Sequence, residues 1–153
     1  MLVHFSREPL NTIESRSQIR DPLGMKPKGL WVSDESSYGW KEWCAENEFN
    51  TSRFAFAHQI HLKPDAKILR IDTVEKLQAF DREYALPKFM DLNMMRGIDW
   101  ARLAETHQGI LISPYQWSCR MDLLWYYGWD CASGCVWDAD AIERITIYQE
   151  QSA

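Results

Sequence analysis

Short apolar runs dominate the chain, and in three places apolar side chains recur at helical spacing instead. The short runs are bounded by glycine, proline and small polar residues, which is typical of strands joined by turns. We expect strands over residues 2–5, 29–33, 54–62, 67–71, 110–112, 135–138 and 145–148. We expect helices from a cap at Ser36 or Ser37 to about Asn47, from Thr73 to just before Pro87, and over residues 98–106.

The order of these elements predicts an α+β fold. Strands outnumber helices and do not alternate with them regularly, so two small sheets are favoured over a doubly wound parallel sheet. The length of 153 residues is typical of one domain, and we expect residues 1–153 to form a single unit with a substantial core. Residues 11–28, which contain Pro22, Gly24 and Pro27, are expected to be a loop, and a short helix within this stretch stays open as an alternative.

Charge and hydropathy disfavour several classes of partner. A formal charge of −5 and a pI near 5.3 make binding to a nucleic-acid backbone less favourable, since such domains are normally basic. No window approaches the roughly 20 apolar residues that span a bilayer, and the first residues lack the basic start and apolar run of a signal peptide. Four cysteines without an export signal fit a reducing compartment, so we expect a cytoplasmic protein that makes no membrane contact.

Aromatic residues are unusually frequent, with eight tryptophans. The densest run covers residues 125–131 and ends in Asp130, and residues 113–117 lie just upstream. Two interpretations stay open for this run: a pocket wall on which a flat ligand stacks, or an aromatic core under a surface loop.

The cysteines favour buried thiols over a metal site. Three residues separate Cys131 from Cys135, and Cys119 is nearby, but no second pair stands at a spacing typical of zinc ligands. We therefore expect no bound metal.

Three segments carry a resemblance to a known family. His4-Phe5-Ser6 ends the first predicted strand, Gly29-Leu30-Trp31-Val32-Ser33 forms the second, and a helix that follows Tyr38 comes next. Cys135-Val136-Trp137-Asp138 precedes the last strand. In this order they resemble the nucleotide site of the ADP-ribosyltransferase fold, in the His-Tyr-Glu branch that includes diphtheria toxin and the poly-ADP-ribosylating enzymes.

The resemblance implies two small, mostly antiparallel sheets packed with flanking helices around a cleft for NAD. It assigns His4 to the adenosine-side ribose and Ser6 to the nicotinamide amide, through its backbone. It assigns Trp31 and Tyr38 to the two sides of the nicotinamide ring, with Ser33 completing the strand that carries Trp31. Stacking of a base on an aromatic side chain is worth about 1–3 kcal/mol, which is enough to orient such a ring.

Charged groups complete the predicted site. Arg7 and Arg53 are candidates to contact a pyrophosphate, because guanidinium matches phosphate oxygens in a bidentate way. The family's catalytic glutamate, which stabilises an oxocarbenium-like transition state, corresponds to Ser133 in this chain. A serine carries no charge, so Asp130, the nearest carboxylate, becomes the candidate catalytic residue.

Three functional hypotheses follow. The first is an NAD-dependent transferase or glycohydrolase that passes ADP-ribose to a macromolecule or to water. The second is a non-catalytic binding or inhibitory module that has kept the aromatic cleft and lost the chemistry, and the third is a scaffold without a small ligand. The chain also resembles a family of small bacteriophage proteins that share residues 26–31 and 129–135, a family to which no activity is attached.

Overall fold

The computed structural model describes residues 1–49, 51, 54–87 and 96–150. Its strands form one seven-stranded sheet in the order β4-β5-β6-β2-β1-β3-β7. Only β4 and β5 run parallel, and the other neighbours are antiparallel. The strands are β1 (Leu2–Ser6), β2 (Leu30–Asp34), β3 (Phe56–Leu62), β4 (Ile68–Ile71), β5 (Gly109–Ile112), β6 (Ser133–Val136) and β7 (Ile142–Glu150).

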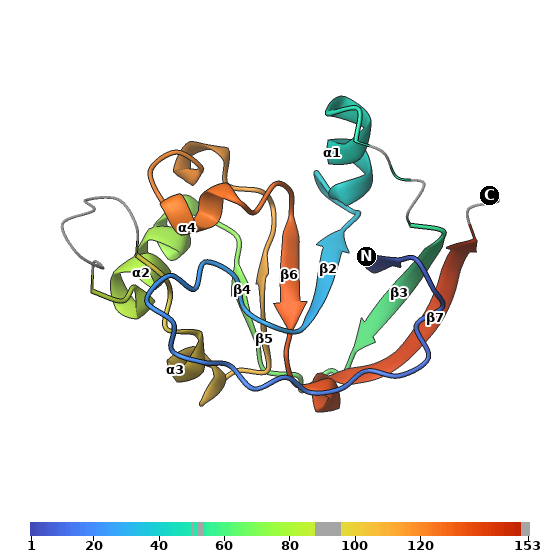
Figure 1. Cartoon of the computed structure of the whole chain (residues 1–153), viewed down its shortest axis with the longest axis horizontal. Coiled ribbons are helices and arrows are strands. Elements are labelled where there is room, and N and C mark those ends of the chain that lie inside the picture. The colour runs from blue at the N-terminus through green and yellow to red at the C-terminus, as the bar shows by residue number, and fades with distance from the viewer. Residues whose placement is uncertain (50, 52–53, 88–95, 151–153) are drawn as a thin grey trace.

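The α+β class is as predicted, but the prediction of two separate sheets is wrong. β1 joins the two halves, because it pairs with β2 on one edge and with β3 on the other. The joint to β2 is short, with Leu2 opposite Asp34 and Val3 opposite Ser33. A joint of two residue pairs constrains the strands weakly, and Figure 1 shows the sheet curling from β4 round to β7. Alternation along one strand cannot reveal such a joint, because it does not encode which strand lies beside it.

The helices largely follow the predicted boundaries. α2 (Val74–Tyr84) begins after Thr73, whose hydroxyl oxygen accepts a hydrogen bond from the Lys76 amide at 3.2 Å, and it ends before Pro87. α3 (Trp100–Ala104) lies inside the predicted range and is capped by Asp99. α4 (Leu124–Tyr127) was not predicted, because its four residues are too short to show a helical period.

The cap of α1 (Trp40–Glu46) differs from the prediction. The residue before the helix is Gly39, and neither Ser36 nor Ser37 caps it. The hydroxyl oxygen of Ser33 accepts the hydrogen bond from the Trp40 amide instead, at 2.7 Å. Ser33 lies in β2, so this contact holds the first turn of the helix against the end of that strand, as Figure 1 shows for α1.

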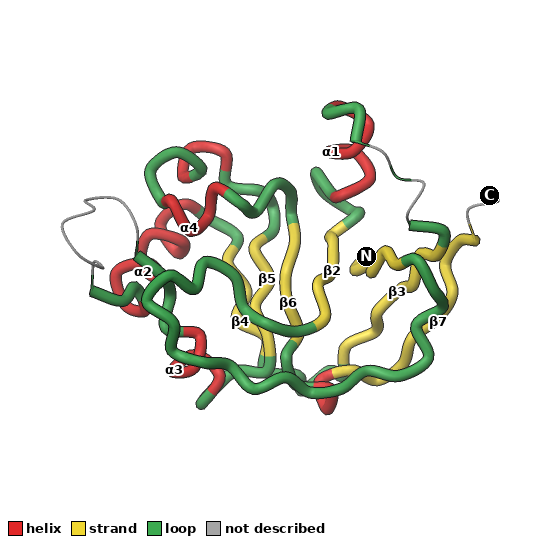
Figure 2. Tube along the Cα trace, viewed as in Figure 1, coloured by secondary structure: helices red, strands yellow, loops and turns green. Residues whose placement is uncertain are grey.

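The long connection between β1 and β2 has no regular structure. Figure 2 shows it as a loop that runs past the lower end of the sheet to α3 and returns to β2. It is held by backbone hydrogen bonds from Arg16 to Trp137 and from Ile98 to Gly24. The prediction of a loop here is confirmed, and these contacts fix its course.

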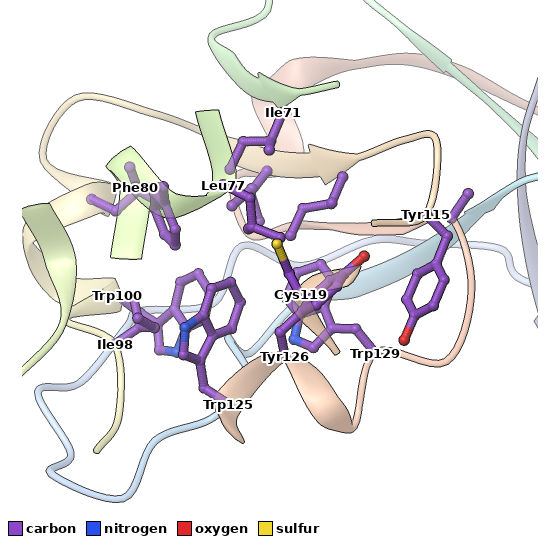
Figure 3. Packing of buried hydrophobic residues seen from close by; sticks show 14 of the residues in the cluster. Ile71, Leu77, Phe80, Ile98, Trp100, Tyr115, Cys119, Trp125, Tyr126 and Trp129 are labelled. Carbon is purple, nitrogen blue, oxygen red and sulfur yellow. The ribbon is translucent and has the colours of Figure 1, made fainter. Parts of the chain in front are cut away.

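Both tryptophans of the predicted aromatic run lie in the core, together with Trp100 of α3. Trp100, Trp125 and Trp129 are at most 2% exposed and pack with Tyr126 between α2–α4 and the face of β4, β5 and β6 (Figure 3). The indole N–H of Trp125 donates to the buried Asp81 at 2.9 Å, so the polar edge of this ring is satisfied. None of the helices in the part of the chain described above has the length and apolarity needed to cross a bilayer.

Candidate functional site

A cavity of about 220 Å³ opens where β1 and β2 separate. It is lined by residues 3–5 of β1, by residues 31–33 of β2, and by residues 128–131 with Ser133. Lys26, Trp40 and Phe54 complete the lining. We call this cavity the β1–β2 pocket.

The pocket brings together residues that are far apart in sequence. His4, Trp31, Ser33, Asp130 and Ser133 were all predicted as site residues, and all line the β1–β2 pocket. Their positions follow from pairing: Val3 lies opposite Ser33, and Ser33 lies opposite Ser133 on the other side of β2. Three segments of the predicted site therefore meet because three strands are neighbours.

His4 bridges the gap between the two strands. Its Nδ1 lies 2.7 Å from the carbonyl oxygen of Trp31. A carbonyl oxygen only accepts, so Nδ1 carries the proton in this contact. Burial lowers the pKa of His4, the hydrogen bond to Trp31 opposes that shift, and nearby His58 lowers the pKa further. The ring is therefore neutral near pH 7, and Nε2 keeps a lone pair that can accept a hydrogen bond from a hydroxyl group.

Aromatic rings form two walls of the pocket. On one side the ring centroids of Trp31 and Trp129 are 4.8 Å apart at an interplanar angle of 70°. On the other side Trp40 contacts Phe54 edge-on, with ring centroids 6.2 Å apart, and stacks on Trp43 at 4.9 Å. These contacts hold the rings in place, so a flat ligand meets walls that are already ordered.

A positively charged side chain, that of Lys26, lies near the ring of Trp31. The Nζ atom of Lys26 is 5.4 Å from the Trp31 ring centroid, within the range of a cation–π interaction. The Trp31 ring therefore offers a surface of negative potential to positive charge at the pocket.

Both serine hydroxyls of the pocket are engaged. Ser33 is 5% exposed, and its hydroxyl donates to Glu35 at 2.6 Å while accepting from Trp40. Ser133 is 7% exposed and donates to the carbonyl oxygen of Cys131 at 3.0 Å. The Ser133 hydroxyl therefore positions the backbone of the segment that carries Asp130.

Asp130 is the carboxylate of the lining residues. Its Oδ1 lies 3.4 Å from a guanidinium nitrogen of Arg120, and both side chains are under one-third exposed. The Arg120 guanidinium lies 5.0 Å from the ring centroid of Tyr127, which supports it from the other side. The contact with Arg120 orients the Asp130 side chain and leaves its other carboxylate oxygen available to a ligand. Burial raises the pKa of the adjacent Cys131 thiol to about 12, so the thiol is protonated near neutral pH and is a poor nucleophile.

Three predicted residues are not brought to the pocket. Ser6 donates to the carbonyl oxygen of Glu8 at 2.7 Å and lies beside His58. Arg7 is exposed and does not line the cavity. Tyr38 donates to Glu46 at 2.6 Å, and its ring packs 5.0 Å from that of Trp117. Arg53 lies outside the described residues.

Three aromatic residues and one lysine are among the lining residues that were missed as site residues. Trp40 and Phe54 had been assigned to a helix and a strand, and Trp129 to an aromatic run with two interpretations. Lys26 had no assigned role, although it lies in the stretch Lys26-Pro27-Lys28-Gly29-Leu30-Trp31. Only the proximity of Lys26 to Trp31 along the chain could have suggested it.

A second cavity, of about 610 Å³, lies at the far end of the sheet and has a mixed charge. Four acidic residues line it, and one of them, Asp138, already accepts hydrogen bonds from Gln108 at 2.8 Å and from the Asp140 amide at 2.9 Å. Lys63 and Lys67 also line it. Among its described lining residues Trp137 is the one tryptophan, whereas three tryptophans and two phenylalanines line the β1–β2 pocket, which is therefore the better candidate site.

Comparisons with known proteins add no relative: no family model, no curated protein and no solved structure matches this chain.

Proposed function

We propose that the β1–β2 pocket binds the nicotinamide and the attached ribose of NAD. The protein is then an ADP-ribosyltransferase-like enzyme that cleaves the bond between nicotinamide and this ribose. The observation that carries this proposal is the convergence of His4, Trp31 and Asp130 on one pocket. Each of them was assigned to such a site from a different segment of the sequence.

The size of the pocket limits what it holds. Pockets for drug-sized ligands usually measure about 300–1,000 Å³. A cavity of about 220 Å³ accommodates a ring with its sugar, but not a whole dinucleotide. The pyrophosphate and the adenosine must then lie at the mouth of the pocket.

The charge of the pocket suits nicotinamide in its nucleotide form, where the ring carries a positive charge. Trp31 already has the Lys26 ammonium near its ring, and a pyridinium ring can replace that cation over the indole. The neutral Nε2 of His4 can accept a hydrogen bond from a ribose hydroxyl. Asp130 supplies the negative charge on the remaining side.

The reaction breaks the bond between ribose C1′ and the ring nitrogen. Both electrons go to the nitrogen, so nicotinamide leaves as a neutral molecule and positive charge develops on the ribose. The Asp130 carboxylate stabilises this charge, and an acceptor oxygen from water or from a macromolecule bonds to C1′ and releases its proton.

The first test is thermal unfolding with and without NAD. At about a hundred times its dissociation constant, a ligand stabilises by about 2.7 kcal/mol, which raises the Tm by roughly 5–10 °C for this chain length. The shift should disappear in Trp31→Leu and persist in Trp117→Leu, which changes an indole that is 54% exposed and lies outside the pocket. A wild-type protein with no shift at saturating NAD would refute the proposal.

One observation favours the second candidate, a non-catalytic binding or inhibitory module. Ser133 stands where the resembling family has its glutamate, and its hydroxyl is used to hold the Cys131 carbonyl. That candidate predicts NAD binding without release of nicotinamide by the wild type. It further predicts that Ser133→Glu, checked for folding by circular dichroism, releases nicotinamide.

A further inference from the structure

We propose that Lys26 is the residue that recognises phosphate at this pocket, so that the pocket selects nicotinamide ligands that carry a 5′-phosphate. This inference rests on the proposed function and adds a specificity determinant to it. Arg7 and Arg53 had been the candidates for this role, but Arg7 does not line the pocket and Arg53 lies outside the described residues.

Lys26 stands at the mouth of the pocket. It is exposed, and it is the one Lys or Arg among the described lining residues. Among the described residues, no carboxylate lies within 4 Å of the Lys26 ammonium group. Its close neighbour is the Trp31 ring, whose centroid lies 5.4 Å from Nζ. The charge is therefore available to an anion.

The backbone around Lys26 is held on both sides, although it has no regular structure. Before it, the carbonyl oxygen of Gly24 accepts hydrogen bonds at 3.0 Å from the indole of Trp100 and from the amide of Ile98. After it, the side chain of Gln18 bonds both the amide and the carbonyl of Lys28, at 2.9 and 2.6 Å. These anchors fix the backbone from which the Lys26 side chain extends, which lowers the entropy cost of using that side chain for binding.

The side chain of Lys26 also lies beside the segment that carries Asp130. A Cβ added to Gly128 would lie 3.4 Å from Cε and 3.8 Å from Nζ of Lys26. The lining therefore carries a cation at Lys26 and, two residues beyond Gly128, the Asp130 carboxylate, one oxygen of which contacts Arg120 at 3.4 Å. Nicotinamide mononucleotide has the complementary pair of charges, a positive ring and a negative phosphate.

Binding then exchanges one cation for another. The pyridinium ring takes the place of the Lys26 ammonium over Trp31, and the displaced ammonium reaches the phosphate at the mouth. A ligand without phosphate displaces the ammonium with no such compensation. Lys26 therefore favours phosphorylated ligands and disfavours their unphosphorylated forms.

Isothermal titration of the full chain with nicotinamide mononucleotide and with nicotinamide riboside tests this inference. The wild type should bind the mononucleotide roughly fivefold more tightly, the strength of an exposed ion pair, and the preference should shrink as salt screens it. Lys26→Gln should bind both ligands about equally, and Lys26→Arg should keep the preference. The matched control is Lys28→Gln, which removes an exposed lysine outside the pocket and should leave the preference unchanged.

The outcomes separate the two proposals. Equal affinities for both ligands in the wild type, or an unchanged preference in Lys26→Gln, would overturn the role of Lys26 while leaving the nicotinamide site intact. A loss of preference in Lys28→Gln as large as in Lys26→Gln would also overturn it, because bulk charge would then explain the effect. If neither ligand binds, the proposed function itself fails, and the inference about Lys26 fails with it.

Discussion

The Nδ1 atom of His4 lies 2.7 Å from the carbonyl oxygen of Trp31, across the gap between β1 and β2. Beyond the pairs Leu2–Asp34 and Val3–Ser33, the ladder between these strands stops, and the imidazole donates to the carbonyl oxygen on the opposite strand. The side chain thus holds together two strands of the pocket that it also lines. The His4 imidazole therefore has both a proposed role in ligand binding and a structural role.

His4 makes stability depend on pH in a defined direction. Burial lowers the pKa of His4 in the folded state below the ordinary value of 6.5, so the unfolded chain binds the proton more readily. The stabilising contribution is present above pH 6.5 and is lost as the pH falls through the pKa of the folded state. His4→Gln, whose amide can still donate to Trp31, should show a smaller loss of unfolding free energy between pH 7.5 and pH 5.

Urea unfolding of both proteins at these two pH values measures the difference. The difference between the wild type and the variant then reports the part of the pH dependence that requires the His4 imidazole. An equal pH dependence in the two proteins would contradict the assigned ionisation of His4.

Replacement of Asp130 by Asn should separate binding from chemistry. The amide keeps the shape and the proximity to Arg120 but removes the negative charge that the proposed reaction needs. We expect the Kd for NAD to change by less than about fivefold, and the rate of nicotinamide release to fall by about a hundredfold or more. Release at the wild-type rate would assign the chemistry to another group.

The hydroxyl of Tyr38 should be dispensable for NAD. It donates to Glu46 at 2.6 Å, and Tyr38 does not line the pocket. Tyr38→Phe should leave the Kd for NAD unchanged within about twofold and cost about 1 kcal/mol of stability, the typical value of one hydrogen bond. Calorimetric titration and urea unfolding of the same preparation measure both quantities. A large loss of affinity would place Tyr38 at the ligand after all.

Gly134 should tolerate no side chain. A Cβ at this position would lie 2.3 Å from the carbonyl oxygen of Ile110 and 3.0 Å from Cα of Leu111, because β5 and β6 approach closely here. Removing this clash requires a shift of the backbone in the centre of the sheet. Gly134→Ala should therefore lower the free energy of unfolding by about 3 kcal/mol or more.

Gly128→Ala is the matched control, since its Cβ meets only the flexible end of Lys26 at 3.4 Å. It should change the unfolding free energy by less than about 1 kcal/mol. Equal free energies of unfolding for the two variants in urea would contradict the close approach of β5 and β6 at Gly134.

The sequence by itself determined local structure. The alternating and continuous apolar runs located all seven strands within a few residues, and Thr73 and Pro87 marked the limits of α2. Such features depend on residues within a turn or two of each other, so they can be read along the chain. The same limit explains the failure at α4, where four residues do not complete a recognisable period.

Only the tertiary structure decided the pairing of the strands and the composition of the pocket. The two residue pairs between β1 and β2 turned two expected sheets into one, and this short joint created the gap that His4 bridges. Lys26 became a pocket residue because distant residues, Gln18 and Trp100, hold its loop. Contacts between distant residues depend on the packing of the whole core, and no local preference of the sequence encodes them.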